Sequence, residues 1–204
     1  MNKNNYDNKQ LNENNIHKYM IEEFGSSFIT ERKTLYRVPC LLQNDFGEKN
    51  DCTLTSITAC LSYLLGISNY DYIYATVLFY ARTYGFSTKN GTNPLCIKKI
   101  YDSAYYDIVG EQRKSSSKYL KNVGVTEKVI INNIQNNIPM ILSFMSDGRN
   151  YYHNHSVTII GYTIVQYKFD NKKTTMLLRI YDNWSNEISY IDFKKLSTVC
   201  SINY

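Results

Sequence analysis

The chain has 204 residues, of which 43% are hydrophobic, and it carries a formal net charge of +5. This length suffices for one domain with a sizeable core or at most two small lobes, and only three prolines and nine glycines argue against a fibrous or disordered class. The basic residues are scattered and often neighbour acidic ones, so nucleic acid is not an expected partner.

The N-terminal part of the chain is polar. Residues 1–30 are expected to form an extension that is partly disordered or packed on the body, and residues 31–204 are expected to form the main domain. Within the extension, we expect residues 1–15 to fray and residues 16–28 to form a short helix. Pro39 predicts an edge or a turn in the extended segment that follows.

Apolar residues at helical spacing predict four helices in the next part of the chain. Gly66 and Gly85 are expected to end the first two helices. Asn93 is expected to cap the third, with Pro94 at its first position, and Thr126 is expected to cap the fourth. The predicted helices cover residues 53–65, 73–84, 94–106 and 127–136, with a loop over 110–118.

The pattern changes after Pro139, where apolar residues alternate in segments bounded by polar turns. A period of two is typical of β-strands. The predicted strands cover residues 140–145, 155–165, 174–182 and 188–192. A helical half followed by an antiparallel sheet predicts an α+β fold.

Several kinds of protein and site are not expected. Five cysteines without a CxxC motif argue against a disulfide framework or a zinc ribbon, and His153 and His155 lack a third metal ligand at a recognisable spacing. No metal or cofactor is therefore predicted. No apolar run approaches a membrane span, and residues 1–10 lack the apolar core of a signal peptide, so a cytoplasmic location is the default, although a leader could be missing.

Four residues, taken in chain order, have the side chains that a thiol-based acyl-transfer site requires. Gln43 carries an amide that could donate to a developing oxyanion. Cys52 starts the first core helix, where free N–H groups and the helix dipole favour a thiolate. His155 begins a strand, which would hold its ring in the fixed orientation that a general base needs. Asp182 ends the next strand, where a neighbouring imidazole N–H would satisfy its carboxylate.

Each of these side chains also has a purely structural interpretation. Cys52 could be a small buried hydrophobe, and Asp182 could simply start a turn with Asn183. Asp51 could oppose thiolate formation by its charge, or it could cap the helix. Trp184 could shield the hydrogen bond between carboxylate and imidazole from water, or it could belong to the core.

Taken together, the order and spacing of these residues resemble those of papain-like cysteine peptidases. Residues 154–162 resemble the histidine strand of that family, and residues 181–185 resemble its Asn-Ser-Trp segment, with Asp182 in the orienting position. Residues 38–56 resemble the branch related to bacteriocin-leader (double-glycine) peptidases, in particular its stand-alone bacterial domains. The resemblance covers residues 38–193.

The resemblance implies a papain-like fold in which a helical half carries Cys52 and a half-barrel sheet carries His155 and Asp182. It implies hydrolysis of a peptide or amide bond, in which a Cys52 thiolate paired with an imidazolium attacks the carbonyl and Gln43 stabilises the oxyanion. The implied partner is a peptide or protein substrate, and no cofactor is implied. An acyltransferase or glutamine deamidase with the same site, and a catalytically silent peptide-binding module, are the open alternatives.

Overall fold

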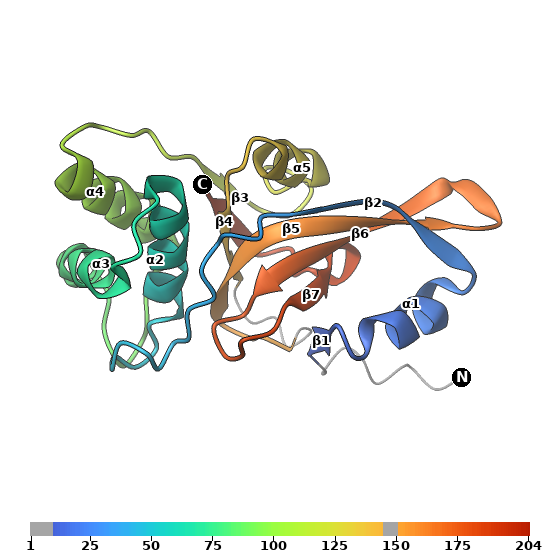
Figure 1. Ribbon diagram of the computed structural model, residues 1–204, viewed down its shortest axis with the longest axis horizontal. Helices are drawn as coiled ribbons and strands as arrows, with labels where there is room; N and C mark the ends of the chain where they lie inside the picture. Colours follow the sequence, from blue (N-terminus) through green and yellow to red (C-terminus); the bar gives the residue numbers. More distant parts are fainter. Residues whose placement is uncertain (1–9, 145–150) are drawn as a thin grey trace.

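The computed structural model describes residues 10–144 and 151–204. Three helices, α2, α3 and α4, lie at one end of the molecule and the β-sheet lies at the other (Figure 1). The helices and the sheet are thus segregated, and the predicted α+β fold class is confirmed.

The helical half contains α2 (Cys52–Leu65), α3 (Tyr70–Tyr84) and α4 (Ile97–Val109), and α4 continues from a short 3₁₀ helix (Pro94–Cys96). A further helix, α5 (Glu127–Gln135), packs on the sheet. These bounds confirm the four helices that the apolar spacing predicts.

The residues expected at the helix ends occupy those ends. Gly66 and Gly85 follow α2 and α3 with φ angles of 65° and 114°, which glycine adopts without a steric penalty. Asn93 and Thr126 each cap the helix that follows, with a side chain that accepts a backbone N–H. Local signals therefore account for where these helices start and stop.

Within the described residues, the sheet has eight strands in the order β1-β7-β6-β5-β4-β8-β3, and β2 pairs with β5 beside this path. Every one of these pairings is antiparallel. The strands are β1 (Leu11–Asn12), β2 (Ser27–Thr34), β3 (Ser117–Tyr119), β4 (Met140–Phe144), β5 (His155–Tyr167), β6 (Asp170–Tyr181), β7 (Ser189–Asp192) and β8 (Cys200–Asn203).

The N-terminal segment differs from the expectation. Helix α1 (Ile16–Phe24) stops at Gly25 rather than at residue 28, and the chain continues as β2. The described part of the segment expected to fray is ordered, because β1 pairs with β7 and Leu11 is buried. Residues 1–9, and residue 145 at the end of a predicted strand, lie outside the described residues.

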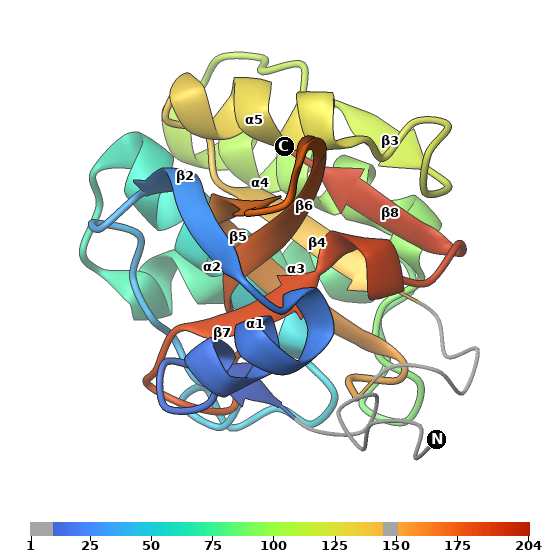
Figure 2. The same ribbon diagram turned by 90° about the vertical axis from the view of Figure 1, so that its right-hand side faces the viewer.

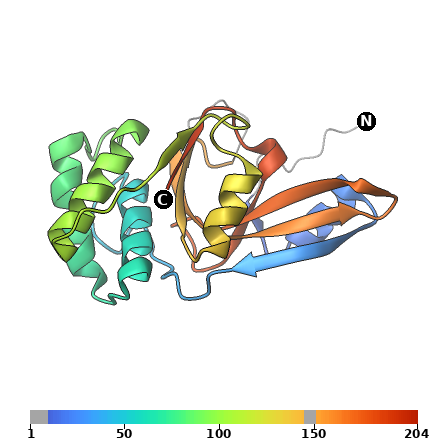
Figure 3. The same cartoon turned by 90° about the horizontal axis from the view of Figure 1, so that it is seen from above.

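Helix α1 packs on one end of the sheet, next to β7 (Figure 2). Tyr19 and Phe24 of α1 form an apolar cluster with Val165 and Leu177 from β5 and β6. The long β5–β6 hairpin extends beyond the rest of the molecule, with β2 alongside it (Figure 3). The described part of the N-terminal segment, from β1 to β2, therefore packs on the sheet.

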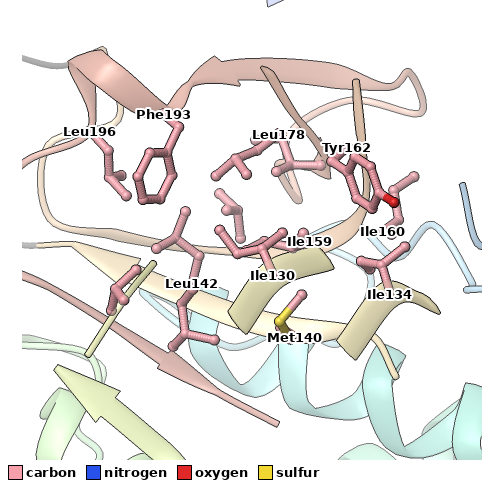
Figure 4. Close-up of a cluster of buried hydrophobic side chains, with 14 of the residues drawn as sticks. Ile130, Ile134, Met140, Leu142, Ile159, Ile160, Tyr162, Leu178, Phe193 and Leu196 are labelled. Atoms are coloured by element: carbon pink, nitrogen blue, oxygen red, sulfur yellow. The ribbon is translucent and has the colours of Figure 1, made fainter. Parts of the chain in front are cut away.

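The main core lies between α5 and the sheet (Figure 4). Ile130 and Ile134 of α5 pack with Met140 and Leu142 of β4 and with Ile159 of β5, and all five side chains are fully buried. Complete burial of one such side chain contributes about 1.5–3 kcal/mol. This core fixes the position of β5, whose first residue is His155.

Helix α2 lies between this core and a second one in the helical half. Leu54, Ile57 and Leu61 belong to the cluster shared with α3 and α4, whereas Ala59 belongs to the cluster of the sheet. Because α2 is packed on both sides, its N-terminus, and with it Cys52, has a fixed place beside the sheet.

Candidate active site

A cavity of about 720 Å³ lies between the start of α2 and the first residues of β5. Three of the four residues predicted for the site line it, namely Gln43, Cys52 and His155. The fourth, Asp182, is fully buried, and its backbone carbonyl oxygen contacts the ring of His155. The structure thus brings all four residues together, although they are far apart in the sequence.

Cys52 is the first residue of α2, so its own backbone N–H is one of those that a helix leaves without an internal partner. The sulfur is within hydrogen-bonding reach of the backbone N–H of Ser156 and of Thr53. Ser156 directly follows His155 in β5, so these contacts place the thiol beside the start of that strand.

The ring of His155 is held by a backbone carbonyl. Its Nε2 lies 2.7 Å from the carbonyl oxygen of Asp182. Because a carbonyl can only accept, Nε2 must carry the proton and Nδ1 is left with the lone pair. The indole of Trp184 stacks on the ring, with centroids 4.1 Å apart, and it is half exposed rather than part of the core. The tautomer that a general base requires is therefore fixed.

Burial favours the neutral form of both the Cys52 thiol and the His155 imidazole. It raises the pKa of the Cys52 thiol, and the neighbouring N–H groups only partly offset this effect. It lowers the pKa of His155 to about 4, against the opposing influence of the Asp182 carbonyl and carboxylate. Burial therefore favours the thiol and the neutral imidazole over the thiolate–imidazolium pair that the resemblance implies.

The carboxylate of Asp182 does not play the part expected from the sequence. Its Oδ1 accepts the backbone N–H groups of Trp184 and Ser185, at 3.0 and 3.1 Å. Its Oδ2 accepts the hydroxyl of Ser189 at 3.1 Å and the side-chain amide of Gln10. The imidazole N–H meets the backbone oxygen instead, so the carboxylate shapes the turn that presents this oxygen.

Asn183 also belongs to the site, although the sequence did not predict it there. Its Nδ2 lies 3.1 Å from the carbonyl oxygen of Cys52, 3.1 Å from that of Ser156 and 2.9 Å from Ser56 Oγ. The backbone carbonyl of Asn183 accepts the backbone N–H of Gln43 at 2.8 Å. Its backbone is left-handed, with φ of 63°, which asparagine tolerates better than most residues. An Asn directly after the predicted strand was the available signal.

Gln43 presents its amide to the cavity in a defined orientation. Its Oε1 accepts the indole N–H of Trp184 at 3.2 Å. Since the indole can only donate, this contact assigns the oxygen of the amide and leaves Nε2 as the donor end. A donor at this place is what the oxyanion role requires.

The structure distinguishes the two roles considered for Asp51, which are capping α2 and opposing thiolate formation at Cys52. It makes no side-chain capping bond to α2; its buried carboxylate accepts the hydroxyl of Tyr74 at 2.5 Å. Burial raises the pKa of Asp51 to about 6. Its charge is a minor contribution to the raised pKa of Cys52, so Asp51 weakly opposes thiolate formation.

All five cysteines are free thiols. In the part of the chain that the structure describes, no three His, Cys, Asp or Glu side chains gather closely enough to hold a metal ion. Over the same residues, no helix combines the length and apolar character needed to cross a membrane.

The sequence and the structure were compared with those of known proteins, and one family model matches most of the chain. The model described as "Peptidase_C39 like family" matches residues 35–198. Among solved structures, the chain is similar to a double glycine motif protease from an AMS/PCAT transporter in complex with the leader peptide, at 18% identity and a TM-score of 0.45, over 86% of this chain and 96% of that one. It is also similar to a protein from Bacillus anthracis described as a C39-like peptidase, at 13% identity and a TM-score of 0.49, over 85% of this chain and 98% of that one. Among curated proteins, none matches.

Proposed function

Because the chain belongs to the Peptidase C39-like family, we propose that it hydrolyses a peptide or amide bond through an acyl-enzyme on Cys52. The observation that carries the proposal is the hydrogen bond from His155 Nε2 to the Asp182 carbonyl. It leaves Nδ1 as the basic nitrogen of a ring that shares its cavity with the thiol. A nucleophile with an oriented base is the minimum that acyl transfer requires.

The first half of the reaction forms the acyl-enzyme. As the Cys52 sulfur attacks the substrate carbonyl, its proton passes to Nδ1 of His155, because both groups are neutral at rest. The carbonyl oxygen becomes an oxyanion, which accepts hydrogen bonds from the Cys52 backbone N–H and from Nε2 of Gln43. The tetrahedral intermediate then collapses, the C–N bond breaks, and the imidazolium gives its proton to the leaving amine.

The second half releases the acyl group. His155 Nδ1, neutral again, takes a proton from a water molecule that attacks the thioester. Collapse of the second tetrahedral intermediate breaks the C–S bond, and the proton returns to the sulfur. The products are a carboxylic acid and an amine, and the enzyme is restored without a cofactor.

The lining of the cavity favours a polar peptide. Amide side chains and hydroxyl groups supply most of it, and Lys89 is the one charged side chain among the described residues that line it. Asn50 fixes this wall, because its Nδ2 donates to the carbonyl oxygen of Thr88 at 2.8 Å. We therefore expect neutral or acidic peptide segments to bind better than basic ones.

The test is cleavage of a mixed peptide library followed by mass spectrometry of products and enzyme. Cys52→Ala and His155→Ala should each reduce cleavage by at least ~10³-fold, and an acyl adduct should be found on Cys52 of the native protein. Cys96→Ala is the matched control, since this thiol lies outside the cavity, and it should cleave normally. Full cleavage by Cys52→Ala would refute the proposal.

The same experiment separates the alternatives. An acyl group found on an added amine would indicate an acyltransferase, and ammonia released from glutamine side chains would indicate a deamidase. A protein that binds peptides but never forms an adduct on Cys52 would be a silent binding module.

A further inference from the structure

The segment that precedes the family match is built into the molecule. The match begins at residue 35, yet β1 and β2 add two strands to the sheet before that point. Helix α1 between them covers an apolar cluster of its own. What this segment contributes to the site can be followed through one side chain, Gln10.

Gln10 is held in place by its neighbours. Its backbone carbonyl accepts the side-chain N–H of Asn15 at 2.9 Å, and Asn15 Oδ1 accepts the backbone N–H of Asn12 at 2.9 Å. Leu11, between them, is only 7% exposed. The start of β1 is thus clamped, which orients the Gln10 side chain toward the turn after β6.

The amide of Gln10 completes a closed set of hydrogen bonds. Its Nε2 donates to Asp182 Oδ2 and, at 3.0 Å, to Ser189 Oγ. Ser189 in turn donates its hydroxyl proton to Asp182 Oδ2 at 3.1 Å. Asp182 is fully buried, so the loss of Gln10 would leave its carboxylate with one donor fewer.

Asp182 transmits this contact to the catalytic ring. Its carbonyl oxygen holds Nε2 of His155, while its Oδ1 holds the backbone of Trp184, whose indole stacks on the same ring. Without the bond from Gln10, the carboxylate would keep its other donors but lose one restraint. The carbonyl and the indole would then be held less firmly.

We propose that Gln10 is a positioning residue for His155, acting through Asp182, so that the segment before the family match is a working part of the active site. The inference rests on the proposed function. It makes residues 10–12 necessary for turnover although they do not line the cavity.

The test exchanges the hydrogen-bond donor at position 10 with the acceptor at position 182. Gln10→Glu sets two carboxylates against each other, and Asp182→Asn sets two amide donors against each other. Each single variant should lower kcat/KM about tenfold or more. In the double variant, the amide introduced at position 182 can donate to the carboxylate introduced at position 10, so most of the loss should be recovered. A double variant no better than the product of the two single losses would overturn the proposal.

A pH series provides a second readout. When the carboxyl group of the Gln10→Glu variant is protonated, it can donate to Asp182 as the amide does. The ratio of its kcat/KM to that of the native protein should therefore rise as the pH falls from 8 to 5. A ratio that is constant over this range would contradict the positioning role. Asn14→Ala is the matched control, an exposed asparagine of the same segment, and should match the native protein at every pH.

NMR of the His155 ring tests the inference without relying on turnover, so a variant that is inactive because it is misfolded can be recognised. The ¹⁵N chemical shifts of the His155 ring report which nitrogen carries the proton. The native protein should show the Nε2-protonated ring, and Gln10→Ala should show a mixture of tautomers. An unchanged ring signal in a folded Gln10→Ala variant would overturn the inference alone, whereas hydrolysis that does not need Cys52 would overturn the proposed function.

Discussion

The side-chain amide of Asn183 ties the backbone of Cys52 to the strand that starts at His155. Its Nδ2 lies 3.1 Å from the carbonyl oxygen of Cys52 and 3.1 Å from that of Ser156. Cys52 and His155 come from different halves of the molecule, and the Asn183 side chain spans the boundary between them. Their relative position therefore depends on a residue that takes no part in proton transfer.

Replacing Asn183 by glycine should loosen this boundary. Glycine keeps the left-handed backbone, with φ of 63°, so the substitution removes only the amide and its hydrogen bonds to the backbone oxygens of Cys52 and Ser156. We expect the free energy of unfolding to fall by about 1–3 kcal/mol and kcat/KM to fall with it. Denaturant unfolding and peptide cleavage measure the two effects.

Asn137→Gly is the control for the Asn183 variant. Asn137 also has a left-handed backbone, with φ of 59°, but it is exposed. Its replacement should change the free energy of unfolding by less than about 0.5 kcal/mol. Equal losses at both positions would show that the backbone conformation, and not the amide of Asn183, carries the effect.

The resting protonation state predicts a distinctive pH profile for alkylation of Cys52. Since burial raises the pKa of the thiol and lowers that of His155 to about 4, the thiolate is scarce at neutral pH. The rate of reaction with a neutral alkylating reagent should rise steadily from pH 6 to pH 9. Mass spectrometry of the modified peptide measures this rate. A rate already at its plateau near pH 5 would indicate a thiolate–imidazolium pair instead.

The oxyanion role of Gln43 can be separated from its packing. Gln43→Glu retains an acceptor for the Trp184 indole but removes the Nε2 donor. Loss of one such donor typically costs ~10²–10³ in turnover, and we expect a loss of this size for both Gln43→Glu and Gln43→Ala. Alkylation of Cys52 in the alanine variant should be nearly unchanged, because that reaction develops no oxyanion.

Asn44→Ala serves as the control for Gln43, since the neighbouring side chain is exposed and lies outside the cavity. It should retain full turnover. If Gln43→Ala also retains full turnover, another donor fills the oxyanion role, and Asn50, which lines the cavity, is the first candidate.

Asp51 should make the stability of the protein depend on pH. Burial raises the pKa of this carboxyl group from the usual 3.8 of an aspartate to about 6 in the folded protein. A raised carboxyl pKa means that the folded state binds the proton more tightly, so this contribution to stability is present below pH 4 and is lost as the pH rises through 6. Relative to the native protein, Asp51→Asn should therefore lose up to about 3 kcal/mol more stability at pH 4 than at pH 8.

Unfolding by denaturant at a series of pH values tests this prediction. Asp107→Asn, at an exposed aspartate in α4, should leave the pH dependence as it is in the native protein. An Asp51→Asn variant whose stability has the same pH dependence as that of the native protein would contradict the raised pKa of Asp51.

Elements with a strong local signal could be predicted from the sequence. Helix α2 has apolar residues at regular spacing and ends at Gly66, and strand β5 alternates through Val157 and Ile159. The strands that were missed have weak local signals: β3 and β8 span three and four residues, and most side chains of β2 are exposed. Their pairing depends on partners far away in the chain, which no local pattern contains.

The same contrast holds for the site. Side chains with recognisable chemistry, such as Cys52 and His155, could be proposed from residue type and position. The part played by Asp182 through its carbonyl could not, because every residue has a carbonyl and only the folded backbone shows which one meets the ring. The amide of Asn183 could not be proposed either, because two of its three partners are backbone oxygens.

The hydrogen bond between Gln10 and Asp182 joins positions 172 apart in the sequence. Contacts of such long range form late in folding, after the entropy of closing a large loop has been overcome. A chain whose helical half alone has formed would contain Cys52 but neither the oriented imidazole nor the turn that holds it. Hydrolysis by the proposed mechanism would then arise only once the whole polypeptide is folded.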